Sequence, residues 1–168
     1  MKREPITHIG YKKLMKDLQF LKEVEIPENI EDIKISASYG DLTENAEYEA
    51  AKERQEFLQM KVDLLEKINS EITIIDPSKN THSIISSGST FEIENIETGE
   101  ELKYTIVGGY EANPSNGTIS YNSPVSRYFL GKEEDDEVVV NIGNQVSTYE
   151  IQEIYFDQNI ILNNIGQK

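Results

Sequence analysis

The sequence contains no cysteine, no tryptophan and only two histidines, His8 and His82, which lie far apart in the chain. The chain therefore has no disulfide and no thiolate ligand for a metal. Two isolated histidines argue against a histidine-based catalytic or metal site, and we expect both at the surface. No apolar run approaches the roughly 20 residues of a membrane span, and the start MKREPITHIGYKKL lacks the apolar core of a secretory signal. These absences favour a cytoplasmic protein without a membrane partner.

Basic residues are also few. The 168 residues include 16 Lys and Arg against 31 Asp and Glu, a net charge of -15. Independent binding to duplex nucleic acid is not expected, because phosphate contacts need clustered basic side chains. The balance instead favours docking on basic or mixed protein surfaces. The length allows one or two domains.

The N-terminal part of the chain has the apolar spacing of two helices. Apolar residues recur every three or four positions on both sides of GDLTEN, residues 40–45, which predicts two antiparallel helices joined at a short tip. Pro27 is expected to break or kink the first helix. The predicted stripe consists of Tyr11, Leu14, Leu18, Leu21, Ile30, Ile33 and Ala37, then Ala46, Ala50, Ala51, Leu58, Val62, Leu65, Ile68 and Ile72.

The pattern changes at Asp76-Pro77-Ser78, where runs rich in β-branched and aromatic residues begin. The sequence therefore predicts an α+β protein with a helical hairpin over 1–76 and a mostly antiparallel sheet domain over 77–168. Ser123 and Pro124 are typical of a helix start, and Gly131 of a helix end. The segment from Asp157 is expected to be a weakly ordered tail or an added edge segment. The predicted strands are 82–85, 89–96, 101–107, 117–121, 137–142 and 146–156.

Two carboxylates, Asp41 and Glu44, lie in the predicted tip. Asp-x-x-Glu before a helix is also a capping box, with Asp41 as N-cap and Glu44 at the third position. The alternative is metal binding, because Mg²⁺ prefers carboxylate oxygens. Two ligands are too few for a tight site, so other ligands would have to come from a partner that already holds a metal.

The stretch SYGDLTENAEYEAAKERQ closely resembles the tip of bacterial Gre transcript-cleavage factors, and the GreA type is the closer match. The stretches IIDPSK, NSPVSRYFLGKEEDDEVVV and IGYKKLMKDLQFLKEVEIPENI resemble the same family in the same order. The resemblance implies an N-terminal coiled coil and an FKBP-like C-terminal domain that docks on RNA polymerase. The coiled coil would enter the secondary channel, where Asp41 helps to hold the second Mg²⁺ and Glu44 orients or deprotonates water. The polymerase itself would then cleave the 3′ end of a backtracked transcript, so the chain would be an activator and not an enzyme.

The resemblance also implies two surfaces. The residues facing RNA would be Lys34, Lys52 and Arg54, a thin basic patch that lacks the arginine often found before the tip in this family. The residues that dock on the polymerase would be Ser123, Pro124, Arg127, Gly131, Lys132, Glu133, Asp135 and Asp136. A charge run such as 133–137 is usually an ordinary solvated loop, and that interpretation stays open for each residue of the segment.

Three other functions are considered. The first is a regulator that binds the secondary channel without stimulating cleavage, against which the intact acid pair argues. The second is a peptidyl-prolyl isomerase, suggested only by the implied fold, which does not carry function by itself. The third is a coiled-coil adaptor, for which the tip sequence would have no special role.

Overall fold

The computed structural model describes residues 3–41 and 45–165. Its contacts divide the chain into two compact units, one of residues 12–71 and one of residues 1–11 with 72–168. The first residues group with the C-terminal part because β1 (Glu4–Thr7) pairs in parallel with β2 (Ile72–Ile75). This pairing was not predicted from the sequence. It shows that the chain starts in the second unit, forms the hairpin and then returns to the second unit. The linear division at residues 76 and 77 stays a prediction.

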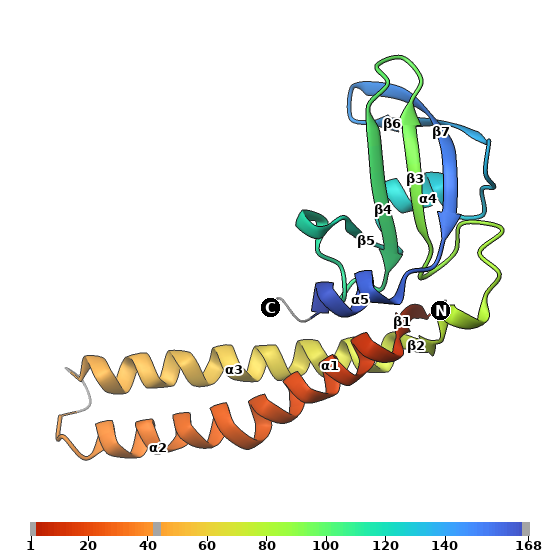
Figure 1. Cartoon of the computed structure of the whole chain (residues 1–168). Coiled ribbons are helices and arrows are strands. Elements are labelled where there is room, and N and C mark those ends of the chain that lie inside the picture. Colours follow the sequence, from red (N-terminus) through yellow and green to blue (C-terminus); the bar gives the residue numbers. More distant parts are fainter. Residues whose placement is uncertain (1–2, 42–44, 166–168) are drawn as a thin grey trace. The chain divides into compact units, whose positions relative to one another are not determined.

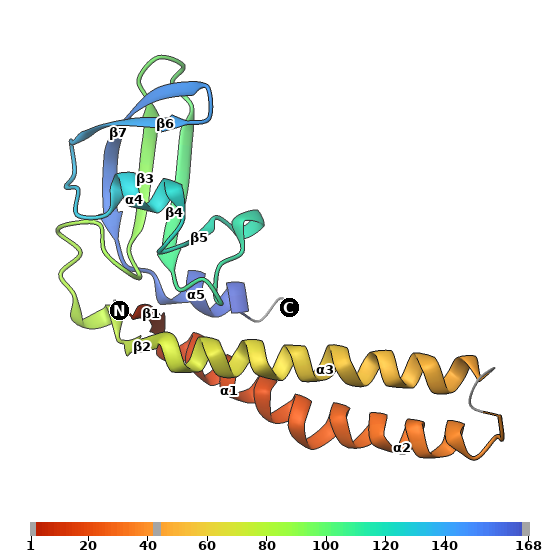
Figure 2. The ribbon, with the colours of Figure 1, turned by 180° about the vertical axis from the view of Figure 1, so that it is seen from behind.

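The first unit is a hairpin of long helices. The outgoing arm consists of α1 (His8–Phe20), a π-helical segment (Leu21–Glu25) and α2 (Ile26–Ala37), and the returning arm is α3 (Ala46–Glu71). The two arms lie side by side and antiparallel (Figures 1 and 2, red to orange and yellow). The 26 residues of α3 span about 39 Å at 1.5 Å per residue. The expected helical hairpin is confirmed.

The seam between the arms is apolar near its middle, where Leu18, Leu21, Leu58 and Val62 are buried together. The distortion expected at Pro27 lies just before it, in the π-helical segment. The Ile26 N–H bonds to the Leu21 carbonyl, five residues back.

This wider turn changes which side chains of α2 face the seam, because a π turn holds more residues than an α turn. Asn29 and Ser36 are buried, whereas Ile30 is 41% exposed. Ala46 and Ala50 are also exposed, while Ala51 is buried. The predicted stripe was therefore wrong at Ile30, Ala46 and Ala50.

Asn29 is the polar residue of this seam, and it is only 1% exposed. Its Nδ2 donates to the carbonyl of Ala51 on the facing helix over 3.0 Å. Its Oδ1 is buried and has no hydrogen-bond partner among the described residues. A buried acceptor without a partner costs stability, while a single polar residue in such a seam restricts the register of the helices.

We predict that Asn29→Leu raises the free energy of unfolding by about 1 kcal/mol, because it replaces an unpaired buried acceptor with an apolar group of similar volume. Urea unfolding followed by circular dichroism measures the change. Asn29→Asp is the matched control, and it should lower stability because it buries a charge. A leucine variant less stable than the native protein would contradict this account of Asn29.

The second unit contains a five-stranded sheet in the order β5-β4-β3-β7-β6. All neighbours in it are antiparallel except β4 and β5, so the expected mostly antiparallel sheet is confirmed. The helix α4 covers one face of the sheet (Figure 2). The bounds are β3 (Thr90–Asn95), β4 (Glu101–Val107), β5 (Thr118–Ser120), α4 (Pro124–Phe129), β6 (Glu137–Ile142), β7 (Gln145–Tyr155) and α5 (Gln158–Ile165), with 3-10 turns at Pro77–Lys79 and Pro114–Asn116.

The core of this unit lies between α4 and the sheet. Phe91 on β3 and Phe129 on α4 are both almost completely buried, and their ring centroids are 5.1 Å apart. The Tyr104 and Tyr149 rings pack against this pair. Large rings contribute much of the buried apolar area in a core of this size, which explains why α4 is held on the sheet.

Three sequence-based expectations were wrong in this unit. The segment 82–85 is not a strand. His82 is not at the surface: it is 7% exposed, and its two ring nitrogens bond to the Pro77 carbonyl and the Ser89 hydroxyl. Its ring also stacks on Phe156. The segment after Asp157 is neither a weakly ordered tail nor an edge strand: its described part forms α5, whose Ile161 is buried.

A buried carboxylate, Glu111, joins the start of α1 to the loop after β4. It is 2% exposed and accepts hydrogen bonds from the backbone N–H groups of Thr7 and Gly108, at 3.0 and 3.1 Å, and from the Thr7 hydroxyl. A Cβ at Gly10 would overlap the Glu111 side chain, so a glycine is required there. Burial raises the pKa of Glu111, and the hydrogen bonds from Thr7, Gly108 and Gly10 oppose part of that rise.

We predict that Glu111 makes stability fall as the pH rises above the ordinary glutamate pKa of 4.5. Below that value the carboxyl is protonated in both states. Between that value and the raised pKa, the unfolded chain has lost a proton that the folded chain still holds, so the free energy of unfolding decreases with pH. Urea unfolding of the native protein and of Glu111→Gln across this range measures the effect. The difference in the free energy of unfolding between the native protein and Glu111→Gln should change with pH and then level off. A difference that stays constant with pH would contradict the raised pKa of Glu111.

No helix in the described ranges is long and apolar enough to cross a membrane.

Candidate functional site

The tip of the hairpin begins where α2 ends. Ser38 follows the last residue of α2, and its N–H bonds to the carbonyls of Lys34 and Ile35. Gly40 then takes a φ of +114°, a conformation that residues with a Cβ rarely adopt. Asp41 follows and is exposed to solvent. Glu44, the second predicted acid, lies outside the described residues.

The N-terminus of α3 is capped by Asn45. Asn45 Oδ1 accepts from the backbone N–H of Tyr48 over 3.1 Å, and the Asn45 carbonyl accepts the first helical bond, from Glu49. Asn45 therefore takes the cap position of α3, because α3 begins at Ala46 and the residue before the first helical residue is the N-cap. The expected capping box pairs Asp41 with Glu44, which lies outside the described residues, so that pairing stays a prediction.

The site offers carboxylate chemistry but not a complete metal site. Carboxylate oxygens match the preference of Mg²⁺, and the positive pole of a helix N-terminus favours anions near it. Among the described residues, however, no group of three or more His, Cys, Asp or Glu side chains could hold a metal ion. A Mg²⁺ at Asp41 would thus need ligands from elsewhere.

The three predicted RNA-facing bases lie on the hairpin, and each has a partner there. Lys34 Nζ is 3.6 Å from the Glu31 carboxylate, and Lys52 Nζ donates to Gln55 over 3.1 Å. Arg54 lies 3.9 Å from two carboxylates, those of Glu25 and Asp32. It also lines a groove of about 420 Å³ whose other walls are Asp32, Ile35, Ser36, Tyr39, Glu47, Ala50 and Ala51.

Two of the three basic residues, Lys34 and Arg54, therefore lie next to acids of the same hairpin, and the RNA-facing roles of all three, with Lys52, stay predictions.

The start and end of the predicted docking segment are as expected. Ser123 caps α4 by accepting from the Ser126 N–H over 3.1 Å, and Pro124 is the first helical residue. Gly131 has a φ of +81° after the helix. These three residues have structural roles that explain their presence without any partner.

The acidic loop that follows is mostly exposed to solvent, and two of its carboxylates also bond to backbone. Glu134 Oε1 accepts from the Ile154 N–H on β7 over 2.9 Å, and Asp136 Oδ2 accepts from the Glu133 N–H over 2.9 Å. The exposed charged residues of this segment are Arg127, Lys132, Glu133, Glu134, Asp135 and Glu137. The docking role of all these residues stays a prediction.

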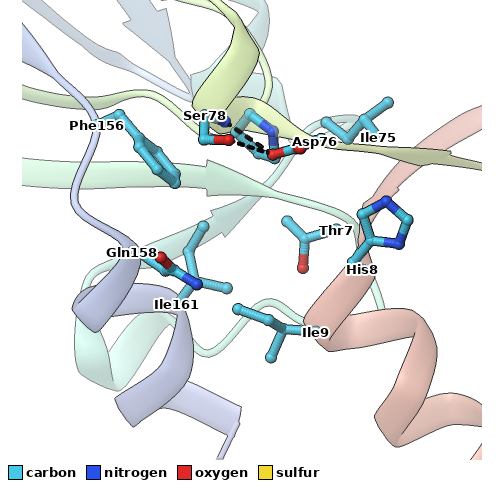
Figure 3. Close-up of a pocket in the computed structure, with 10 residues that line it drawn as sticks. Thr7, His8, Ile9, Ile75, Asp76, Ser78, Phe156, Gln158 and Ile161 are labelled. Atoms are coloured by element: carbon cyan, nitrogen blue, oxygen red, sulfur yellow. Dashed lines mark hydrogen bonds between the residues drawn. The ribbon is translucent and has the colours of Figure 1, made fainter.

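A pocket of about 280 Å³ lies in the second unit (Figure 3). Asp76 accepts hydrogen bonds from the N–H and hydroxyl of Ser78, which lower the pKa of Asp76. Phe156 supplies its aromatic wall. The aromatic rings of Phe91 and Phe129 are instead buried in the core. The pocket thus has little of the aromatic lining that an apolar prolyl substrate would favour.

Sequence reasoning missed Asn45 as part of the tip. The available signal was the residue type, since asparagine is among the strongest N-caps. The Asp-x-x-Glu pattern, which begins four residues earlier at Asp41, gave a competing start for the helix. Only the position of Ala46 as the first helical residue distinguishes the two.

Two family descriptions match the chain, one for each part. "Transcription elongation factor, N-terminal" covers residues 4–74, and "Transcription elongation factor, GreA/GreB, C-term" covers residues 80–156. Both parts of the chain thus match one class of protein, the transcription elongation factors. The chain belongs to the GreA/GreB family.

Two relatives from other organisms agree with this assignment. "Transcription elongation factor GreA" of Wolinella succinogenes is 44% identical over 158 residues, which are 94% of this chain and 98% of the relative. The protein of the same name from Nautilia profundicola is 43% identical over 94% of this chain and 97% of its own length. A solved structure, GreA factor homolog 1 (Gfh1) of Thermus thermophilus, is 26% identical over 91% of this chain and 99% of its own, with a TM-score of 0.42.

Proposed function

We propose that this protein binds bacterial core RNA polymerase and stimulates the polymerase's own Mg²⁺-dependent cleavage of backtracked transcripts. The tip would reach the catalytic centre through the secondary channel, and cleavage of the extruded 3′ end would return an arrested complex to elongation in the cytoplasm. The observation that supports this is the exposed carboxylate of Asp41 at the tip of a two-helix arm in a member of a transcription elongation factor family.

Asp41 would contribute an oxygen ligand to a Mg²⁺ that the polymerase holds weakly. A second Mg²⁺ in such a centre supplies charge stabilisation and a water of lowered pKa. Glu44 is proposed to orient that water or to accept its proton. The protein completes the centre of another macromolecule in this proposal, and it has neither a metal of its own nor a catalytic activity in isolation.

The second unit is proposed to dock at the rim of the channel through the segment around α4. Its exposed charges, Arg127 and Lys132 beside Glu133 and Asp135, form a mixed surface that can pair with a mixed surface on a partner. The alternative of a channel-binding regulator without cleavage activity shares this docking step. It differs at the tip, where it requires no function for Asp41.

We predict that Asp41→Asn lowers the cleavage rate at saturating factor by about 100-fold, because it removes a charge that acts on the reacting centre. The measurement is single-turnover cleavage of RNA in a defined backtracked complex with purified core polymerase and Mg²⁺. Asp63→Asn makes the same change on the exposed shaft of α3 and should leave the rate unchanged. Native-like stimulation by Asp41→Asn would refute the mechanism and favour the adaptor or regulator alternatives.

The docking segment should affect affinity rather than the rate at saturation. We predict that the double variant Arg127→Ala, Lys132→Ala raises the half-saturating factor concentration about tenfold, equal to about 1.4 kcal/mol, with an unchanged maximal rate. The same cleavage assay over a range of factor concentrations measures both quantities. Lys79→Ala, an exposed change elsewhere in this unit, is the control. An unchanged half-saturating concentration would exclude docking through these two residues.

A further inference from the structure

Asn45 holds both helix ends that flank the tip. Its Nδ2 donates to the carbonyl of Ser36 in the last turn of α2 over 2.7 Å, while its Oδ1 accepts from the Tyr48 N–H in the first turn of α3. A single carboxamide thus joins the end of one helix to the start of the other. The bonded residues are nine positions apart in the chain, and Asp41 lies between them.

Each of these bonds is made to a backbone group at a helix end. The last four carbonyls and the first four N–H groups of a helix have no partner within it, and the Ser36 carbonyl and the Tyr48 N–H belong to these two sets. The Ser36 carbonyl also accepts from the Tyr39 N–H over 3.2 Å, so Asn45 supplies its second donor. Asparagine suits both at once because its side chain carries an acceptor and a donor on one rigid plane.

The anchor on α2 is itself well fixed. Ser36 is 3% exposed, and its hydroxyl donates to the Asp32 carbonyl over 2.8 Å. On the other side, the Asn45 carbonyl begins the helical hydrogen bonds of α3. The chain from Ser36 to Asn45 therefore starts and ends at points that cannot move independently.

We propose that Asn45 is a positioning residue: the bond from its Nδ2 to Ser36 closes the tip and holds Asp41 where it can reach a metal. The purpose inferred for this hydrogen bond rests on the proposed function, whereas the hydrogen bond itself does not. Closing a short loop removes conformations from every residue inside it. Misplacement of a reacting group by about 1 Å can cost 10²-fold in rate, so the closing bond matters even though Asn45 touches no reacting atom.

Two substitutions separate the two bonds of Asn45. Asn45→Ser keeps a good N-cap for α3 but has no N–H to offer Ser36. Asn45→Ala removes both bonds. Gln59→Ala is the matched control, because it removes a side-chain amide of α3 that bonds to Asp63 on its own helix.

The first measurement uses the full-length protein alone. We expect ¹⁵N relaxation to give a lower order parameter for the Asp41 amide in Asn45→Ser than in the native protein, with Leu58 in the seam unchanged. Values fall from about 0.85 in rigid backbone to below 0.6 in flexible backbone. An Asp41 order parameter that is the same in both proteins would overturn the proposal, whatever happens in transcription.

The second measurement is transcript cleavage with core polymerase. Asn45→Ser should lower the rate at saturating factor about tenfold or more while the half-saturating concentration stays that of the native protein, and Gln59→Ala should match the native protein in both. A native rate for Asn45→Ser would overturn the positioning role. Failure of the native protein itself to stimulate cleavage would refute the proposed function, and the order parameter would still decide whether Asn45 holds the tip.

Discussion

The hairpin depends on a short connection that joins the end of α2 to the start of the antiparallel helix α3. Such a connection leaves unpaired carbonyls at the end of one helix and unpaired N–H groups at the start of the next. Here the backbone of Ser38, the left-handed Gly40 and the carboxamide of Asn45 meet that requirement. Asp41 lies in this connection and is exposed to solvent, and the proposed chemistry uses its carboxylate.

The shaft of the hairpin follows a different rule. Its middle is apolar, but the π-helical segment before Pro27 turns Asn29 into the seam. There the Nδ2 of Asn29 is hydrogen-bonded, whereas its Oδ1 has no partner among the described residues. Such a residue lowers stability while it restricts register. The proposed function requires the tip to reach a defined place, and for that purpose a fixed register has a value that greater stability would not replace. The buried Glu111 network similarly ties the beginning of α1 to its own unit through named hydrogen bonds.

Much of this arrangement could be predicted from the sequence. The spacing of Leu14, Leu18 and Leu21 indicated the first helix, and the runs 101–107 and 137–142 matched β4 and β6 residue for residue. The elements that were missed depend on distant partners. The β1–β2 pair needs strands 68 positions apart, and the burial of His82 needs Pro77 and Ser89 around its ring. Neither periodicity nor propensity contains that information.

The candidate site shows the same division. Asp41 could be found from its residue type and from family resemblance, whereas Asn45 was hidden because a competing capping pattern precedes it. The side of α2 that faces the seam could not be predicted either, because a π turn cannot be recognised from the spacing of apolar residues. The position of a helix start or a wider turn is decided by one or two hydrogen bonds, and these are visible only when both partners are placed.

The central claim is that the tip brings a metal ligand to the polymerase, and the Mg²⁺ dependence of cleavage tests it most directly. Cleavage by core polymerase in a backtracked complex is measured over a range of Mg²⁺ concentrations, with and without saturating amounts of this protein. The account predicts that the protein lowers the Mg²⁺ concentration required for half-maximal cleavage. An unchanged Mg²⁺ requirement, with or without a change in the maximal rate, would contradict it.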